Sequence, residues 1–345
     1  MFYNSKAKAY FNILRNNILN LMRVNVMPRF AHIYITWKCN LKCKDCSNWK
    51  KDSSKELSSE EWISVIKKLS FLDIVKITGG EPFEREDIVP IIKAIRTNIN
   101  PYILQITTNG TYTSRIVNFI KKIHFPQLHL RISLDGIGEV HDAIRGQSGC
   151  YKKTEETLFE LIALRKHYPF HLGINYGLRE NSLCFLDYIS KLCNDNSIGL
   201  ILGYPVKPFL EDIESRSSDF KFDVATNVIK AYREYINFKC IAGSFSEKIF
   251  NKYINRYFLK LESSGRFNFC CGELKDLIYI FPQGDLVTCG LRHAKVANFL
   301  NSDFNDIWFS DKIKSLRKKV KSCPGCLQKS IKMVSEMYNM SQLFF

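Results

Sequence analysis

The segment CNLKCKDC, residues 39–46, carries the strongest signal in this chain, because it places Cys39, Cys43 and Cys46 within eight residues. A tetrahedral zinc site normally takes four ligands, and a cubane iron–sulfur cluster normally takes four thiolates, one for each iron. Three cysteines with no fourth nearby therefore favour a cluster that leaves one iron open to a substrate or cofactor. A zinc site with a distant fourth ligand is the alternative at this point, since thiolates suit both metals.

Four further motifs follow the cysteines along the chain. ITGGEP at 77–82, ITTNG at 106–110 and ISLDG at 132–136 each close an apolar, strand-like run, and HDAIRG follows at 141–146. In this order, the motifs and the cysteines resemble the radical S-adenosylmethionine (SAM) superfamily. The closest resemblance is to its members with a C-terminal auxiliary-cluster domain of the SPASM/Twitch type, and it covers residues 29–329.

Composition limits the classes of protein that fit. A chain of 345 residues that is 46% hydrophobic can bury one large core and a smaller appended unit. It has no apolar run of about eighteen residues, so we expect no membrane span. The N-terminus lacks the apolar region and cleavage site of a secretory signal. Twelve cysteines in such a chain favour metal binding over disulfides, and we expect a cytoplasmic location.

The net charge of +16 is unevenly distributed. Residues 1–44 hold eight lysines and arginines and no acidic residue, and residues 312–321 are again basic. Such regions favour anionic partners, although solubility alone accounts for the charge equally well. We expect an acidic low-potential electron donor such as flavodoxin or ferredoxin, a small-molecule substrate that can be anionic, and no nucleic-acid partner.

From Ile33 to Tyr204, short β-branched runs alternate with amphipathic segments. The expected strands are 32–36, 73–78, 102–107, 128–133, 171–176 and 199–204, and the expected helices are 59–69, 86–97, 113–122, 153–167 and 183–193. This alternation predicts an α/β fold of parallel βαβ units. The motifs fall at the carboxyl ends of the strands, where parallel α/β folds bind ligands. The resemblance implies a partial, open (β/α)6 TIM-like radical SAM barrel with a small C-terminal α+β Twitch domain.

The expected division of the chain has five parts. They are a basic amphipathic helix at 1–28, the radical SAM core at 29–205, a helical connection at 206–268, the Twitch domain at 269–330 and a tail at 331–345. Within residues 5–23, helical spacing gathers five apolar residues on one face: Phe11, Leu14, Ile18, Leu21 and Met22. We expect this face to pack against its own domain, with peripheral membrane contact as the alternative.

The resemblance implies specific roles for the cysteines and for the first glycine motif. Cys39, Cys43 and Cys46 would hold three irons of a [4Fe-4S] cluster, and the fourth iron would chelate the amine and carboxylate of SAM. Reductive cleavage of SAM would then give a 5′-deoxyadenosyl radical that abstracts hydrogen from the substrate. Gly79 and Gly80 permit close backbone approach to a ligand, and Glu81 would take the methionyl ammonium.

Further roles come from the same resemblance. Arg145 matches the arginine that pairs with the SAM carboxylate, a task suited to a planar guanidinium. Ser133 matches a ribose contact and Asn109 lies on the same rim, with Asn175 as a weaker candidate. Asp135 and His141 are expected to shape the loop that orients Arg145.

Asp45 departs from the family pattern, which usually has an aromatic residue before the last cysteine. This substitution leaves the packing partner of adenine open, with Trp37 and Trp49 as candidates.

A second group of cysteines resembles the opening of a Twitch domain. Gly284 would turn a hairpin of strands 277–281 and 286–288. No cysteine follows Cys326, so the resemblance is to the shortened form with one auxiliary [4Fe-4S] cluster, which gives two clusters in all. The implied auxiliary ligands are Cys271, Cys289, Cys323 and Cys326, with Cys270 as the alternative to Cys271.

Three functions are consistent with these features. The first is a radical SAM enzyme of oxidoreductase (dehydrogenase) or epimerase type that acts on a small polar metabolite of sugar, aminocyclitol or nucleotide type. The second is a radical SAM maturase that modifies a ribosomally synthesised peptide, which residues 1–30 do not support because they are too short for a winged-helix recognition module. The third is a non-catalytic iron–sulfur or zinc protein that binds nucleic acid through its basic surface.

Overall fold

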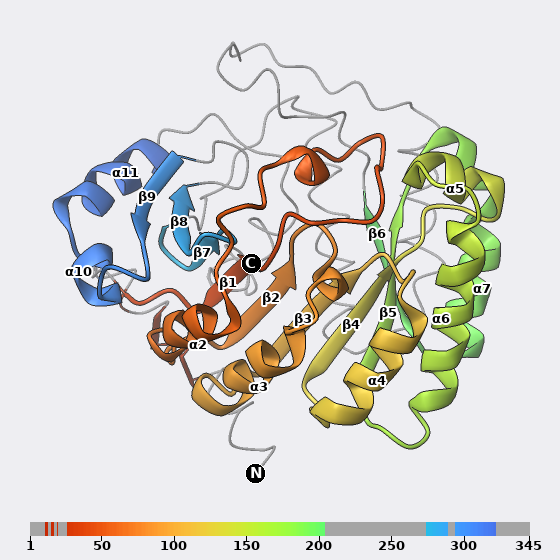
Figure 1. Cartoon of the computed structure of the whole chain (residues 1–345), viewed down its shortest axis with the longest axis horizontal. Coiled ribbons are helices and arrows are strands. Elements are labelled where there is room, and N and C mark those ends of the chain that lie inside the picture. Colours follow the sequence, from red (N-terminus) through yellow and green to blue (C-terminus); the bar gives the residue numbers. More distant parts are fainter. Residues whose placement is uncertain are drawn as a thin grey trace, which may run out of the picture. The chain divides into compact units, whose positions relative to one another are not determined.

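The computed structural model describes residues 11–12, 15–16, 19, 26–203, 274–288 and 294–321 (Figure 1). The chain divides into two compact units. The first unit comprises residues 1–38, 52–105 and 268–345, and the second comprises residues 39–51 and 106–267. Strand β3 (Ile103–Thr108) begins in the first unit and ends in the second.

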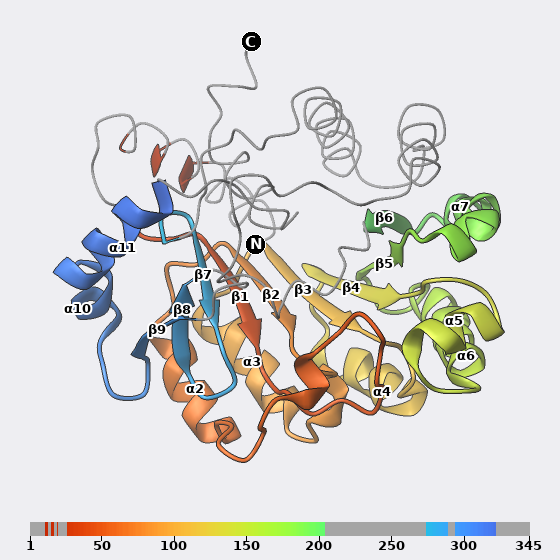
Figure 2. The same cartoon turned by 90° about the horizontal axis from the view of Figure 1, so that it is seen from above.

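The first unit contains parallel and antiparallel strands. Its elements are β1 (Phe30–Tyr34), α2 (Ser59–Lys67), β2 (Ile74–Thr78), the 3-10 turn η2 (Pro82–Glu84), α3 (Ile88–Asn98), β7 (Leu277–Ile280), β8 (Asp285–Thr288), β9 (Ala294–Asn298), α10 (Phe304–Trp308) and α11 (Asp311–Lys321). Strand β1 pairs in parallel with both β2 and β7, whereas β7, β8 and β9 pair antiparallel. Helices α2 and α3 lie on the same side of β1 and β2 (Figure 2).

Helix α2 shows how local sequence sets an element boundary. Ser58 Oγ accepts a hydrogen bond from Glu61 N at 3.2 Å, and the Glu61 carboxylate accepts one from Ser58 N at 2.8 Å. This reciprocal capping box satisfies two N–H groups that the first helical turn leaves without partners. The predicted start of this helix is therefore confirmed, and the helix buries Trp62, Val65 and Ile66.

The predicted C-terminal hairpin is present, and it extends the β1 sheet. Gly284 turns it with a φ of 76°, a conformation that favours glycine. The sequence did not indicate that β7 pairs with β1, where His32 lies opposite Tyr279. Leu57 N also donates to Pro282 O at 2.8 Å, so the hairpin contacts the chain that follows the cysteine loop.

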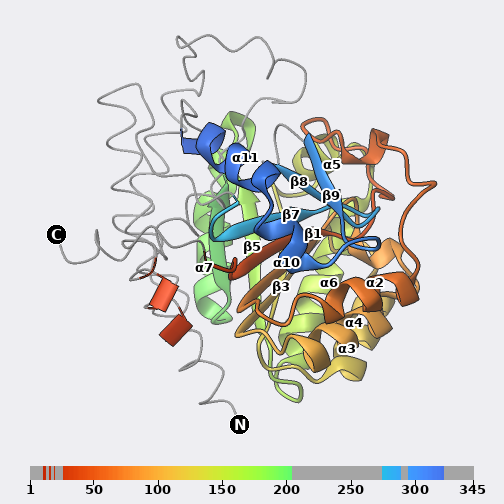
Figure 3. The ribbon, with the colours of Figure 1, turned by 90° about the vertical axis from the view of Figure 1, so that its left-hand side faces the viewer.

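Three elements after the hairpin were not predicted: β9, α10 and α11. Figures 1 and 3 show α10 and α11 next to β9. Lys312 Nζ in α11 donates to Val296 O in β9 at 2.5 Å, and the Trp308 indole N–H donates to Val26 O at 2.8 Å. The Arg317 guanidinium lies over the Trp308 ring at 4.4 Å from its centroid. These contacts fix short helices that have little apolar periodicity of their own.

The second unit follows the predicted alternation. Its elements are η1 (Asn48–Lys50), α4 (Thr113–Ile123), β4 (Leu128–Ser133), α5 (Glu139–Arg145), α6 (Cys150–Leu164), β5 (His171–Gly177), η3 (Glu180–Phe185), α7 (Leu186–Asp195) and β6 (Gly199–Gly203). Strands β4, β5 and β6 pair in parallel, with Ser133 opposite Asn175. The predicted parallel βαβ units are confirmed in both units, whereas helix α5 within the HDAIRG motif was not expected.

One feature of the N-terminal prediction is wrong. Phe11, expected on the buried apolar face, is 64% exposed, while Asn12 and Asn16 are buried. Asn12 Nδ2 donates to Asp73 at 3.0 Å and Asn16 Nδ2 donates to Met27 O at 3.2 Å, so hydrogen bonds anchor two of the residues described in this segment. Leu14, Ile18, Leu21 and Met22, the connection at 206–268 and the tail at 331–345 lie outside the described residues. No described helix is long and apolar enough to cross a lipid bilayer.

The buried ion pair between Arg29 and Asp73 gives a test of this fold. Arg29 Nε and Nη2 donate to the two Asp73 carboxylate oxygens at 2.8 and 2.9 Å, and both side chains are almost fully buried. Removing one partner of such a pair costs about 3–5 kcal/mol, because the other charge stays buried and unpaired. We therefore expect Asp73→Ala to lower the free energy of unfolding by about that amount, measured by urea denaturation followed by circular dichroism.

Asp195→Ala is the matched control. Asp195 pairs with Lys191 on the surface of α7, where both side chains are more than half exposed, and such pairs contribute at most about 1 kcal/mol. Equal losses for Asp73→Ala and Asp195→Ala would contradict the role given to the buried pair.

Candidate active site

In the first unit, the Gly79–Gly80 turn brings two stretches of backbone together. Gly80 N donates to Thr36 O at 2.7 Å and Glu81 N donates to Lys38 O at 2.8 Å. A Cβ atom on Gly79 would overlap Thr36 O, and one on Gly80 would overlap Lys38 O. The two glycines are therefore required for this approach, which fixes the residue that directly precedes Cys39.

Glu81 is buried, and one carboxylate oxygen accepts from Phe83 N at 3.1 Å. Glu56, which the sequence analysis did not single out, holds the same stretch of chain. Its carboxylate accepts from Thr36 Oγ1 at 2.8 Å and from Trp37 N at 2.5 Å. A lone glutamate in a polar loop gives no sequence signal for such a role.

In the second unit, the three cysteines are each half-buried, and none of them forms a disulfide within the described residues. Cys46 N donates to Cys43 O at 3.3 Å, which turns the loop between them. Lys44 N donates to Ile144 O at 3.2 Å, and Gly146 packs so closely on Lys42 O that a Cβ atom would overlap it. The end of α5 therefore supports the middle of the cysteine loop.

The donor set fits the cluster that the sequence predicts. Each iron of a cubane takes one thiolate, and Cys39, Cys43 and Cys46 offer three thiols from one short loop.

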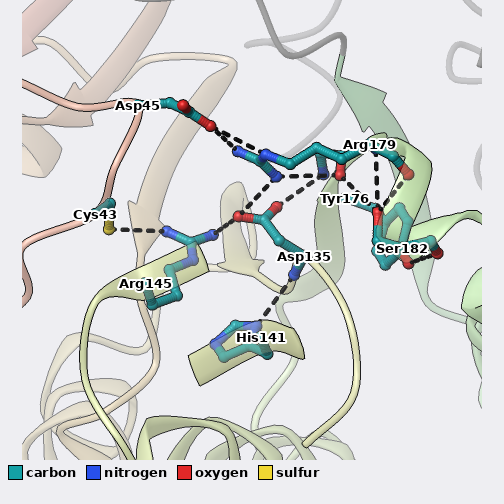
Figure 4. Close-up of polar contacts among 9 residues, drawn as sticks. Cys43, Asp45, Asp135, His141, Arg145, Tyr176, Arg179 and Ser182 are labelled. Carbon is teal, nitrogen blue, oxygen red and sulfur yellow. Dashed lines mark hydrogen bonds and ion pairs between the residues drawn. The ribbon is translucent and has the colours of Figure 1, made fainter. Parts of the chain in front are cut away.

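Arg145 lies between Asp135 and Cys43 (Figure 4). Its Nη2 is 2.8 Å from Asp135 Oδ2, and its Nη1 is 3.9 Å from Cys43 Sγ. Asp135 Oδ1 accepts from Gly177 N at 2.8 Å, and Asp135 N donates to His141 Nδ1 at 3.1 Å. These contacts are the ones expected if Asp135 and His141 shape the loop around Arg145, and that role stays a prediction. Pairing of Arg145 with the SAM carboxylate stays a prediction.

Burial sets the protonation of the groups around this loop. It raises the pKa of the Cys43 thiol, an effect that the Arg145 guanidinium opposes. Burial, followed by the charge of Arg145, lowers the pKa of His141 to about 4. His141 is therefore neutral at pH 7, and its Nδ1 is free to accept the Asp135 N–H. The contact with Asp135 N is consistent with the predicted role of His141 in shaping this loop, which stays a prediction.

The other predicted SAM contacts also lie in the second unit. Asn109 Nδ2 donates to Asn40 Oδ1 at 2.9 Å, and Asn40 Nδ2 donates to Thr111 Oγ1 at 2.8 Å, so Asn109 holds the start of the cysteine loop. Ser133 is half-buried at the end of β4, opposite Asn175. The roles of Asn109 and Ser133 toward SAM stay predictions.

Of the two tryptophans considered as packing partners for adenine, only Trp49 lies in the second unit with the cysteines. Its indole N–H donates to Cys43 O at 3.4 Å, and the Lys50 ammonium lies 5.2 Å from its ring centroid. Trp37 is buried in the first unit against Tyr34 and Phe281. Trp37 is therefore committed to the core, and Trp49 is the better candidate.

Arg179 is a residue of this site that the sequence analysis missed. Its Nη2 and Nε donate to Asp45 at 2.8 and 3.0 Å, and its Nη1 lies 3.5 Å from Asp135. The 134 residues that separate Arg179 from Asp45 left no local signal. The predicted auxiliary ligands lie outside the described residues: Cys270, Cys271, Cys289, Cys323 and Cys326.

Comparison with known proteins agrees with this geometry. Residues 33–189 match the radical SAM superfamily, and residues 260–327 match the SPASM iron–sulfur cluster-binding domain. The sporulation killing factor maturation protein SkfB of Bacillus subtilis is 30% identical over 142 residues, which are 39% of this chain and 33% of that protein. Pre-heme d1 synthase of Dinoroseobacter shibae is 28% identical over 169 residues, 48% of this chain and 40% of that protein.

The fold is also found among solved structures. The crystal structure of Streptococcus suis SuiB bound to S-adenosylmethionine matches with a TM-score of 0.65 and 17% identity, over 93% of this chain and 78% of that one. The predicted α/β class with an open, TIM-like barrel is therefore confirmed. The matched region spans only a third to two-fifths of the curated relatives.

The chain belongs to the radical SAM superfamily and carries a SPASM-type iron–sulfur domain toward its C-terminus. This combination implies two [4Fe-4S] clusters with S-adenosylmethionine, as the sequence predicted.

The close approach at Gly80 leads to a prediction. Gly80→Ala places a methyl group on Lys38 O, and the loop must move away to accept it. A displacement of about 1 Å can cost about 10²-fold in rate. We expect SAM cleavage to fall by about that factor and iron to be lost from the three-cysteine site, measured as 5′-deoxyadenosine formed and iron bound.

Gly203→Ala is the control, since its methyl group would meet only ordinary contacts of 3.7 Å or more. It is expected to behave as wild type. Equal iron content and cleavage rates in both variants would contradict the close-approach argument.

Proposed function

We propose that this chain is a radical SAM enzyme that modifies a ribosomally synthesised peptide. The observation that carries the proposal is its similarity to a named maturation protein, SkfB, which is 30% identical over 142 residues. A second structure of SuiB, bound to its precursor peptide SuiA, matches with a TM-score of 0.60 over 92% of this chain. Peptide modification therefore replaces the small sugar or aminocyclitol substrate as the better-supported reading.

The residues have distinct tasks in this proposal. Cys39, Cys43 and Cys46 hold the first cluster, and Arg145 orients the SAM carboxylate. SAM bound at this site, given one electron through the cluster from the donor, would supply methionine and a carbon radical able to abstract a hydrogen atom from the substrate. Asp135 supports Arg145 because it fixes the guanidinium at 2.8 Å and leaves the Nη1 donor directed at Cys43.

Backbone and carboxylate groups complete the proposed SAM contacts. Gly79 and Gly80 leave room beside the chain that precedes Cys39, and Glu81 takes the methionyl ammonium. Asn109 and Ser133 are the proposed ribose-side contacts. The second cluster is assigned to Cys271, Cys289, Cys323 and Cys326.

The electron donor is proposed to be an acidic low-potential protein. Lys42, Lys44 and Lys50 are exposed on or beside the cysteine loop. Asp45, the single acidic residue between positions 39 and 51, is paired with Arg179. The loop therefore presents unbalanced positive charge, which speeds association with an anionic partner.

A second candidate substrate is a tetrapyrrole-type small molecule. The observation that favours it is the 28% identity to pre-heme d1 synthase over 48% of this chain. For either substrate, the net reaction can be an oxidation or an epimerisation.

The chemistry can be tested without knowing the substrate. Anaerobically reconstituted protein is expected to bind about seven to eight irons, which assumes two cubane clusters, and to convert SAM to 5′-deoxyadenosine when a reductant is present. The Cys39→Ala, Cys43→Ala, Cys46→Ala triple variant should retain only the auxiliary cluster and form no 5′-deoxyadenosine. Chromatographic product analysis and iron assay measure both, and wild-type protein that forms none would refute the proposed chemistry.

The substrate class needs a separate experiment. Short peptides encoded beside the gene are incubated anaerobically with protein, SAM and reductant, and mass spectrometry is expected to show a modified peptide. The triple-cysteine variant is the control and should leave the peptide unchanged. If wild-type protein cleaves SAM and consumes a tetrapyrrole but alters none of the peptides, the peptide proposal is wrong and the second candidate stands.

A further inference from the structure

The cysteine loop is part of a closed ring of contacts in the second unit (Figure 4). Arg145 lies 3.9 Å from Cys43 Sγ and 2.8 Å from Asp135 Oδ2. Arg179 lies 3.5 Å from the same Asp135 oxygen and 2.8 Å from Asp45. Asp45 is two residues after Cys43 in the sequence, so the main chain of the loop closes the ring.

Arg179 is held by its own turn. It directly precedes η3, and its N–H donates to Ser182 Oγ at 3.1 Å while Ser182 N donates to Arg179 O at 3.0 Å. The Tyr176 hydroxyl donates to Ser182 O at 2.6 Å, and burial raises the pKa of Tyr176 to about 12, so this donor keeps its proton. The Arg179 backbone is therefore a fixed point from which its side chain reaches the cysteine loop.

The charges around the ring alternate in sign. Two carboxylates, Asp45 and Asp135, alternate with two guanidiniums, Arg145 and Arg179. Asp45 lies between Cys43 and Cys46 in the sequence, on a loop whose cysteines become thiolates when they bind metal. Arg179 neutralises Asp45, and without it like charges on this loop would repel one another.

We propose that Asp45 and Arg179 are positioning residues for the three-cysteine cluster. Their ion pair, called the latch below, holds the cysteine loop against the turn after β5. Through its contact with Asp135, Arg179 also keeps the Arg145 guanidinium next to Cys43. An aromatic residue at position 45 could not make this contact, so the departure of this chain from the usual pattern gains a structural reason. The inference rests on the proposed role of Cys43 as a cluster ligand.

The test measures how firmly the cluster is held. Iron release to a chelator is followed in reconstituted full-length protein as the loss of visible absorbance. The triple-cysteine variant, which is expected to keep only the auxiliary cluster, gives the absorbance change of that cluster, and this change is subtracted. Asp45→Asn and Arg179→Gln are each expected to release the three-cysteine cluster several-fold faster. Asp45→Glu, which keeps the carboxylate, should remain near wild type.

Two further variants separate the latch from general destabilisation. The double variant Asp45→Asn, Arg179→Gln should release iron no faster than Arg179→Gln alone, because Arg179→Gln already breaks the contact with Asp45 that Asp45→Asn removes. Asp195→Asn removes the exposed pair with Lys191 on α7 and should leave the rate unchanged. A second readout is the electron paramagnetic resonance spectrum of the reduced protein, whose response to SAM should weaken in Asp45→Asn because Arg145 is less well fixed.

The outcomes distinguish this inference from the proposed function. If wild-type protein assembles no cluster on Cys39, Cys43 and Cys46, the proposed function itself fails. If wild-type protein holds the cluster and cleaves SAM but Asp45→Asn matches its release rate and spectrum, the latch alone is wrong. Additive effects in the double variant, or loss in Asp45→Glu equal to that in Asp45→Asn, would also overturn it.

Discussion

The constraint on which the other features depend is that three thiols must be presented from one short, irregular loop. A loop without its own hydrogen-bond ladder has little intrinsic stability, so neighbouring elements must fix its backbone. In the first unit, Gly80 N and Glu81 N donate to the carbonyls of Thr36 and Lys38, just before the first cysteine. In the second unit, Ile144 O and Gly146 hold residues 42–44 from the end of α5. Both supports use backbone groups and glycines, which explains why small residues recur in the motifs.

Side-chain charge adds a second level of support. Asp135 accepts from a backbone N–H and lies next to two guanidiniums, so one buried carboxylate fixes both Arg145 and Arg179. Charge-assisted contacts of this kind are stronger and more directional than neutral hydrogen bonds. His141 contributes as a neutral acceptor, since burial lowers its pKa to about 4. Asp135 and His141 therefore belong to one hydrogen-bonded group that includes Arg145.

Local sequence predicted the elements that local physics controls. Strand β4 coincides with the predicted range 128–133, because the apolar alternation there is unbroken, and α2 begins at the predicted residue 59, where Ser58 and Glu61 form a capping box. The pairing of β7 with β1 joins segments more than 240 residues apart in sequence, and no periodicity encodes such a contact. Arg179 escaped notice for the same reason, and Phe11 was misplaced because helical spacing cannot reveal that Asn12 and Asn16 supply the buried hydrogen bonds.

The pairing of β7 with β1 bears on how the C-terminal iron–sulfur domain is attached. Strand β1 precedes the first cysteine in the sequence and pairs with β7, which in turn pairs with β8. Cys289 is the residue that directly follows β8 in the sequence. Leu57 N and the aromatic contacts of Trp37 with Phe281 reinforce this junction within the first unit. A C-terminal domain joined only by a linker would leave the hydrogen-bonding edge of β1 unpaired. Here β7, from the described hairpin of the C-terminal domain, pairs with that edge. The hairpin is thus a structural part of the first unit, and a change in β7 would reach the strand that precedes the cysteine loop.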